Sequence, residues 1–158
     1  MVIAHIKQTG ETCIARFERH LNHSVEEAWS WLTENEKLAQ WFPELQVGDL
    51  REGGFMQFDM GNGTFEKLEI TEFGKFSVLE FAWWEDSVRF ELHPLADGCD
   101  LILVEKINNI TDHTPKDLAG WHVCLDVIGA LLDGRAIDRT EEWKKWYERY
   151  VQAIKRIK

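Results

Sequence analysis

Residues 120–134 read GWHVCLDVIGALLDG and lie in the apolar part of a long predicted helix. Thr114 followed by Pro115 predicts the cap and the first turn of this helix, and Gly134 predicts its left-handed end. Its apolar stripe recurs at steps of three and four residues and consists of Leu118, Trp121, His122, Leu125, Ile128 and Leu132. A face of this length needs another layer of the fold to pack against.

The preceding half of the chain predicts that layer, because its apolar residues alternate with a period of two. Turn signals stand at residues 61–63, 73–75, 85–86 and 96–98. They separate predicted strands near 64–72, 76–84, 87–93 and 100–107, and two further strands are predicted over 11–21 and after Gly54. The spacing indicates an antiparallel meander of six strands, with a possible seventh near residues 45–50.

Two short helices are predicted between the first strand and the meander. Ser24 with Glu27 forms a capping box, and Thr33 with Glu36 repeats the pattern. The second helix is predicted to run to about residue 40, because Pro43 forbids its continuation. The stretch WLTENEKLAQWF, residues 31–42, then places two aromatic side chains just after it.

A last amphipathic helix is predicted over residues 140–158. Its stripe consists of Trp143, Trp146, Tyr147, Tyr150, Val151, Ile154 and Ile157. This stripe either docks on the same chain, which we favour, or meets its copy in a second chain, so both a monomer and a homodimer fit. The predicted fold is α+β: one domain over residues 1–158, with a curved antiparallel sheet around a long helix.

Composition excludes several classes of function. The chain has 158 residues and a formal net charge of −10 without a basic stripe, which argues against nucleic acid and anionic lipid as partners. It has neither a signal-peptide pattern nor an apolar run long enough for a membrane span, so we expect a cytoplasmic protein. Cys13, Cys99 and Cys124 are far apart and are expected to be structural thiols.

Several strings recur in an order typical of one superfamily. They are Val25, Trp29, Leu32, Thr33, Leu38, Trp41 and Phe42; Asp49-Leu50-Arg51 and Gly53-Gly54-Phe55; residues 79–83 and 88–92; and Gly120-Trp121 with Leu125 and Leu132. This order resembles the SRPBCC or START-like helix-grip superfamily. Within it, the strings are similar to the family named after the activator of heat-shock-protein-90 ATPase.

The resemblance implies a helix-grip fold whose cavity between sheet and long helix takes lipids, sterols, polyketides or aromatic metabolites. Its members include carriers, receptors, cyclases, dioxygenase subunits and co-chaperone domains, so fold alone does not select a function. The family name adds chaperone association and stress response as possibilities. The extra segment from Ala136 to Lys158 departs from the usual pattern.

In a gripping sheet, one parity of each strand and one stripe of the helix should line the cavity. The predicted wall consists of Trp41, Phe42, Met56, Phe58, Phe81, Trp83, Phe90, Trp121, Leu125 and Ile128. Ten large apolar groups facing one helix are hard to pack without a void. Any one of them could instead be solid core.

Polar candidates are few. His122 could hydrogen-bond to a ligand or act as an acid or base, but the sequence offers it no partner. Charged residues inside the predicted strands could also point inward, and the sequence does not say which: Asp59, Glu66, Glu80, Arg89, Glu91 and Glu105. Scattered histidines and the lack of phosphate-binding loops predict no metal and no cofactor.

The sequence therefore favours binding of a small hydrophobic ligand, lipid-like or aromatic. The alternative is an interaction module that engages a chaperone or another protein. An enzyme such as a cyclase or hydrolase using His122 ranks last.

Overall fold

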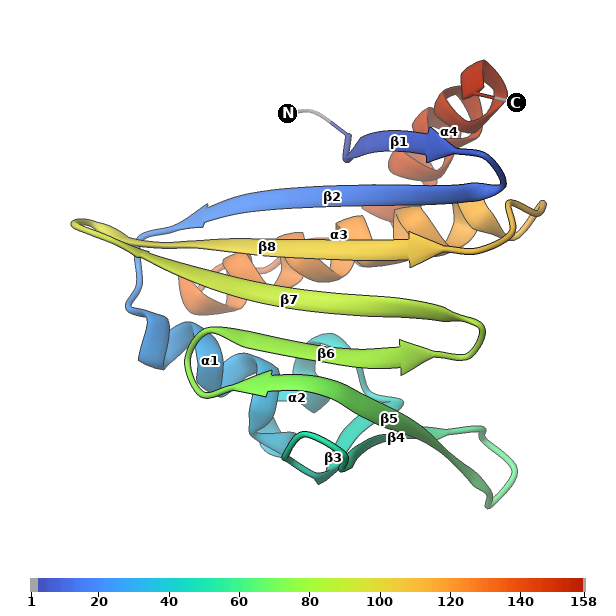
Figure 1. Ribbon diagram of the computed structural model, residues 1–158. Coiled ribbons are helices and arrows are strands. Elements are labelled where there is room, and N and C mark those ends of the chain that lie inside the picture. The colour runs from blue at the N-terminus through green and yellow to red at the C-terminus, as the bar shows by residue number, and fades with distance from the viewer. Residues whose placement is uncertain (1–2, 158) are drawn as a thin grey trace.

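The computed structural model describes residues 3–157 and shows an eight-stranded antiparallel sheet that curves around a long helix, α3 (Figure 1). The strand order across the sheet is β1-β2-β8-β7-β6-β5-β4-β3. The strands are β1 (His5–Thr9), β2 (Thr12–Leu21), β3 (Leu45–Asp49), β4 (Phe55–Asp59), β5 (Phe65–Gly74), β6 (Val78–Trp83), β7 (Asp86–Leu95) and β8 (Gly98–Ile107). This architecture confirms the predicted α+β fold.

Seven of these strands correspond to predicted ones, including the possible seventh, and β1 was not predicted. Four of the five β1 side chains are exposed, so this edge strand lacks the apolar alternation by which a half-buried strand is recognised. Pairing of His5 with Arg16 and of Thr9 with Thr12 attaches it to β2. Its existence depends on backbone pairing, which a hydrophobic pattern does not report.

The helices α1 (Val25–Thr33) and α2 (Asn35–Trp41) follow the first hairpin. The Ser24 hydroxyl accepts the Glu27 amide at 3.1 Å, which confirms Ser24 as the cap, while the Glu27 carboxylate lies 3.3 Å from His23 Nδ1. The predicted second box is wrong, because Glu34 caps α2 through its backbone and the Thr33 hydroxyl donates to the Trp29 carbonyl at 2.9 Å. Trp41 ends α2 instead of following it.

Helix α3 (Thr114–Leu132) packs across the concave face of the sheet. The predicted capping role of Thr114 is wrong: His113 is the cap residue and Thr114 is the first helical residue. Gly134 has a φ of 71°, as predicted for the residue that ends the helix. Thirteen of the nineteen residues of α3 are buried, so α3 has contacts on more than the sheet side alone.

Those further contacts come from α4 (Arg139–Ile157), which lies against α3 beyond the β1 edge of the sheet (Figure 1). Its buried side chains are Trp146, Tyr150 and Ile154. The Tyr150 hydroxyl accepts the Ala4 amide at 2.9 Å and is hydrogen-bonded to His122 Nδ1 at 2.7 Å. The stripe of α4 thus docks on its own chain; Lys158, the last residue of the predicted helix, lies outside the described residues.

Candidate ligand-binding grooves

The space between the sheet and α3 is filled by side chains. Six residues of the predicted wall lie there, and each of them, like Trp121, has at most 2% of its surface exposed: Trp41, Met56, Phe81, Phe90, Leu125 and Ile128. The three aromatic rings among them are in contact, as the edge-to-face pair of Trp41 and Phe90 at 6.2 Å illustrates. None of the six lines either of the two grooves described next.

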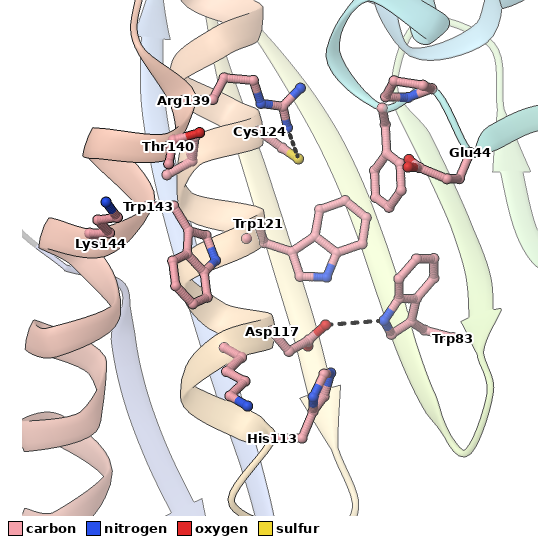
Figure 2. A pocket seen from close by; sticks show the side chains of 15 residues that line it. Glu44, Trp83, His113, Asp117, Trp121, Cys124, Arg139, Thr140, Trp143 and Lys144 are labelled. Atoms are coloured by element: carbon pink, nitrogen blue, oxygen red, sulfur yellow. Dashed lines mark hydrogen bonds between the residues drawn. The ribbon is translucent and has the colours of Figure 1, made fainter. Parts of the chain in front are cut away.

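The first groove, here called the aromatic groove, opens between α3, α4, the segment after α2 and the end of β6 (Figure 2). Its volume is about 570 Å³. It is lined by Phe42, Pro43, Glu44, Trp83, His113, Lys116, Asp117, Gly120, Trp121, Val123, Cys124, Arg139, Thr140, Trp143 and Lys144. Of the predicted wall, the structure therefore brings Phe42, Trp83 and Trp121 together here.

These three rings form one packed wall. The ring centroids of Trp83 and Trp121 are 5.1 Å apart, and Phe42 lies 5.5 Å from Trp121 and 5.8 Å from Trp83. Figure 2 shows Trp121 directed from α3 toward the sheet and Trp143 on the α4 side. Trp143 is stacked on Tyr147 at 4.9 Å, with 5° between the ring planes. The groove thus has rigid aromatic sides contributed by distant parts of the chain.

Two charged residues of the aromatic groove are hydrogen-bonded within the protein. Asp117 accepts a hydrogen bond from Trp83 Nε1 at 3.3 Å, and Arg139 donates to the Trp41 carbonyl at 2.8 Å. Burial raises the pKa of the Cys124 thiol to about 12, although Arg139 beside it opposes the shift. The thiol is therefore protonated near neutral pH and is not a nucleophile in this state.

His122 lies outside both grooves, on the side of α3 that faces α4. Its ring is fully buried, stacks on Trp146 at 3.9 Å and has Nε2 at 3.4 Å from an Asp126 carboxylate oxygen. Burial, together with Arg19 and Lys145, lowers the pKa of His122 to about 3. The ring is thus neutral near pH 7 and joins the two helices.

The second groove, here called the acidic groove, lies beside the first and shares Trp83, His113 and Asp117 with it. Its volume is about 560 Å³. It is lined by Phe58, Trp83, Trp84, Glu85, Asp86, Ile107, Asn109, Thr111, His113, Thr114 and Asp117. Phe58, the remaining residue of the predicted wall, therefore faces this groove.

Sequence reasoning missed the α4 side of the aromatic groove and the carboxylates of the acidic groove. Trp143 was assigned to the stripe of α4, but the sequence did not reveal which helix or chain that stripe would meet. Asp117 lies in the first turn of α3, where an acidic residue is common and by itself gives no sign of a groove. A signal for the acidic groove was present in Trp83-Trp84-Glu85-Asp86, where two large rings precede two carboxylates in a hairpin turn.

A curved antiparallel sheet around a long helix, with a groove beside that helix, defines the chain as a helix-grip protein. Residues 22–133 match the family described as activator of Hsp90 ATPase homolog 1-like protein, and the chain belongs to this family. The match confirms the resemblance drawn from the sequence. No match is found among curated proteins.

Solved structures support the same fold. A conserved protein of unknown function from Enterococcus faecalis, EF2215, is 25% identical over 98% of this chain and 92% of its own, with a TM-score of 0.89. CalU16 from Micromonospora echinospora is 22% identical, covering 93% and 92% of the two chains, with a TM-score of 0.67. Because the EF2215 match covers nearly the whole chain, it includes most of α4, which lies beyond the family match.

No helix within residues 3–157 combines the length and the apolar character needed to cross a membrane.

Proposed function

We propose that the protein binds a small hydrophobic ligand, aromatic or lipid-like, in the aromatic groove. The observation that carries this proposal is a space of about 570 Å³ with four aromatic side chains on its walls, Phe42, Trp83, Trp121 and Trp143. Small-molecule sites commonly occupy about 300–1,000 Å³ and combine apolar walls with a few polar groups. Family membership agrees with a ligand-binding or helper domain.

Affinity in this proposal comes from apolar burial, and orientation comes from the groups at the rim. A flat ligand would lie between Trp143 on α4 and the partly exposed rings of Phe42 and Trp83. Trp121, which is 2% exposed, packs against these two rings and supports them. Asp117 and Arg139 are the polar groups near its ends. The ligand therefore meets the outer side of α3, and the densely packed interior between sheet and helix stays closed.

The position of His122 argues for ligand binding in the aromatic groove over acid or base catalysis by this residue. An enzyme would use His122 as its acid or base, but the His122 ring packs against α4 and lies outside the groove. The three cysteines are buried and unpaired, which agrees with a reducing compartment such as the cytoplasm. We accordingly propose a cytoplasmic carrier or sensor without a chemical step.

A protein-interaction module is the second candidate, and exposed aromatic surface favours it. Trp84 and Phe65 have 46% and 47% of their surface exposed, and Met60 in the β4–β5 hairpin has 44%. Such side chains occur singly on many proteins, so the observation is weaker than a lined groove. If no apolar compound stabilises the protein, this second candidate takes precedence.

The expected result for Trp143→Ala is a loss of ligand affinity of about tenfold, because one of two facing aromatic walls disappears. The test uses an anilinonaphthalene sulfonate probe, followed by fluorescence titration, with melting curves of each variant. A compound present at a hundredfold excess over Kd should stabilise the wild type by about 2.7 kcal/mol. Trp31→Ala is the matched control, since Trp31 is also half-buried but lies outside both grooves.

Equal probe affinity in Trp143→Ala and wild type would contradict the assignment of the aromatic groove. A similar affinity loss in Trp31→Ala would do the same, because it would indicate binding through general apolar surface. Unfolding of Trp143→Ala is not expected, since this side chain is only half-buried and the buried contacts of α4 come from other residues.

A further inference from the structure

The acidic groove has an unusual combination of side chains. Its charged lining consists of Glu85, Asp86 and Asp117, and no lysine or arginine is among its described lining residues. The aromatic groove, in contrast, has Lys116, Arg139 and Lys144 on its walls. The two neighbouring grooves therefore differ in charge, and they call for different ligands.

Three aromatic rings form one wall of the acidic groove. Trp84 lies edge-to-face with Phe58 at 5.0 Å and with Trp83 at 4.9 Å, and Phe58 and Trp83 are 5.7 Å apart. Rings that meet at such angles present both faces and edges to the space beside them. The negative face of an aromatic ring attracts a cation within about 6 Å.

The carboxylates lie beside these rings, since Asp117 accepts a hydrogen bond from Trp83 Nε1 at 3.3 Å and Asp86 is the strand partner of Trp83. Asp86 has the strand parity of Val88 and Phe90, which are buried toward α3, and Asp117 projects from the first turn of α3. Burial raises the pKa of Asp86, and Asp117 and Glu85 raise it further, against the hydrogen bond from the Asn108 amide. These groups thus repel one another, and His113 is the one basic side chain among the described lining residues.

Glu105 adds an independent observation. Its side chain is fully buried on β8, and neither carboxylate oxygen has a hydrogen-bond partner among the described residues. It shares the inward parity of Ile107, a lining residue of the acidic groove, and its nearest titratable neighbours are Asp117 and Asp86. Burial and the adjacent Asp117 raise the pKa of Glu105, so acidic groups gather beside this groove while no lysine or arginine is among its described lining residues.

We propose that the acidic groove binds an organic amine cation. Its ammonium group would contact the rings of Trp83 and Trp84 and the carboxylates of Asp86 and Asp117. The inference concerns a different groove from the one in the proposed function and does not depend on it. An organic cation fits better than a metal ion, because no three His, Cys, Asp or Glu side chains within residues 3–157 are arranged to hold a metal. Aromatic walls also suit the alkyl or aryl part of an amine.

The experiment compares 2-phenylethylamine, which is protonated at pH 7, with uncharged 2-phenylethanol by calorimetric titration of the full chain. The amine should bind at least about tenfold more tightly than the alcohol, and added salt should weaken only the amine. Asp86→Asn should reduce amine affinity about tenfold, since asparagine can keep the Asn108 hydrogen bond but carries no charge. Asp97→Asn is the charge-matched control, because Asp97 lies in the turn between β7 and β8, at the opposite end of these strands.

Trp84→Gly tests the aromatic wall separately. Trp84 has a φ of 55°, a conformation that glycine adopts without strain, so the hairpin should persist without the ring. This variant should also lose about tenfold in amine affinity and keep the affinity of the aromatic groove for anilinonaphthalene sulfonate. Equal binding of amine and alcohol, or equal affinities of Asp86→Asn and Asp97→Asn, would overturn the proposal. If either of these outcomes occurs while anilinonaphthalene sulfonate still binds with unchanged affinity, the proposed function of the aromatic groove is not affected.

Discussion

Replacing Trp146 with alanine is expected to lower the free energy of unfolding by about 3 to 5 kcal/mol. Trp146 is 1% exposed and is the largest buried side chain of α4. Its ring stacks on His122, and its Nε1 donates to Glu142 at 3.2 Å. Truncation leaves a cavity beside the neutral, buried imidazole of His122. This cavity cannot collapse unless α4 moves. Chemical denaturation followed by circular dichroism measures the change.

Glu148→Ala on the same helix is the control for this prediction. Glu148 is exposed, so its replacement should change stability by no more than about 0.5 kcal/mol. The probe affinity of the aromatic groove should fall together with the stability of Trp146→Ala, because α4 supplies one side of that groove. A stability loss below about 1 kcal/mol would mean that α4 docks weakly or is held by a second chain, and sedimentation would distinguish these two cases.

The sequence predicts most of the fold because the strands and helices that build it carry strong patterns. In β2, Cys13, Ala15 and Phe17 alternate with exposed residues, and they are buried as their parity predicts. Most of the α3 stripe is buried for the same reason, although its His122 faces α4 and not the sheet. Where the pattern is weak the prediction fails: β1 has mostly exposed side chains, and the α2 cap uses the backbone instead of a side chain.

The groove walls were only partly predictable, and the reason is packing. Residues such as Phe81, Phe90 and Ile128 have the right parity to line a cavity, but parity cannot distinguish a cavity wall from solid core. Volume decides between them, and volume depends on all neighbours together. The aromatic groove also needs the relative position of α3 and α4, which follows from contacts such as Tyr150 with His122. Those contacts join residues that no local pattern connects.

Glu105 illustrates the same limit for a charged residue. Its place in a predicted strand allowed either face, and an exposed face was the ordinary expectation for a carboxylate. The structure instead buries it, between Ala15 on β2 and Val88 on β7 in the strand register. Burial raises the pKa of Glu105 well above its ordinary value of 4.5, and the adjacent Asp117 raises it further.

The variant Glu105→Gln is therefore expected to be more stable than the wild type at pH 7, by about 1 to 3 kcal/mol. Glutamine keeps the shape of the side chain and is uncharged. Folding at pH 7 then requires neither the burial of a charged carboxylate nor its protonation. Thermal and urea unfolding at pH 7 measure the gain. Glu69→Gln, an exposed position on β5, is the control and should differ from the wild type by no more than about 0.5 kcal/mol.

The pH dependence gives this prediction its sign. A raised pKa in the folded state means that Glu105 favours folding below about pH 4.5, where both states hold the proton, and that this advantage is lost as pH rises toward the folded pKa. Over that interval the wild type should lose up to about 1.4 kcal/mol per pH unit relative to Glu105→Gln. Parallel stability curves for the two proteins between pH 4.5 and 8 would show that Glu105 is ionised in the fold at no cost. Such a result would contradict the raised pKa of Glu105 and, with it, the expected stability gain of Glu105→Gln.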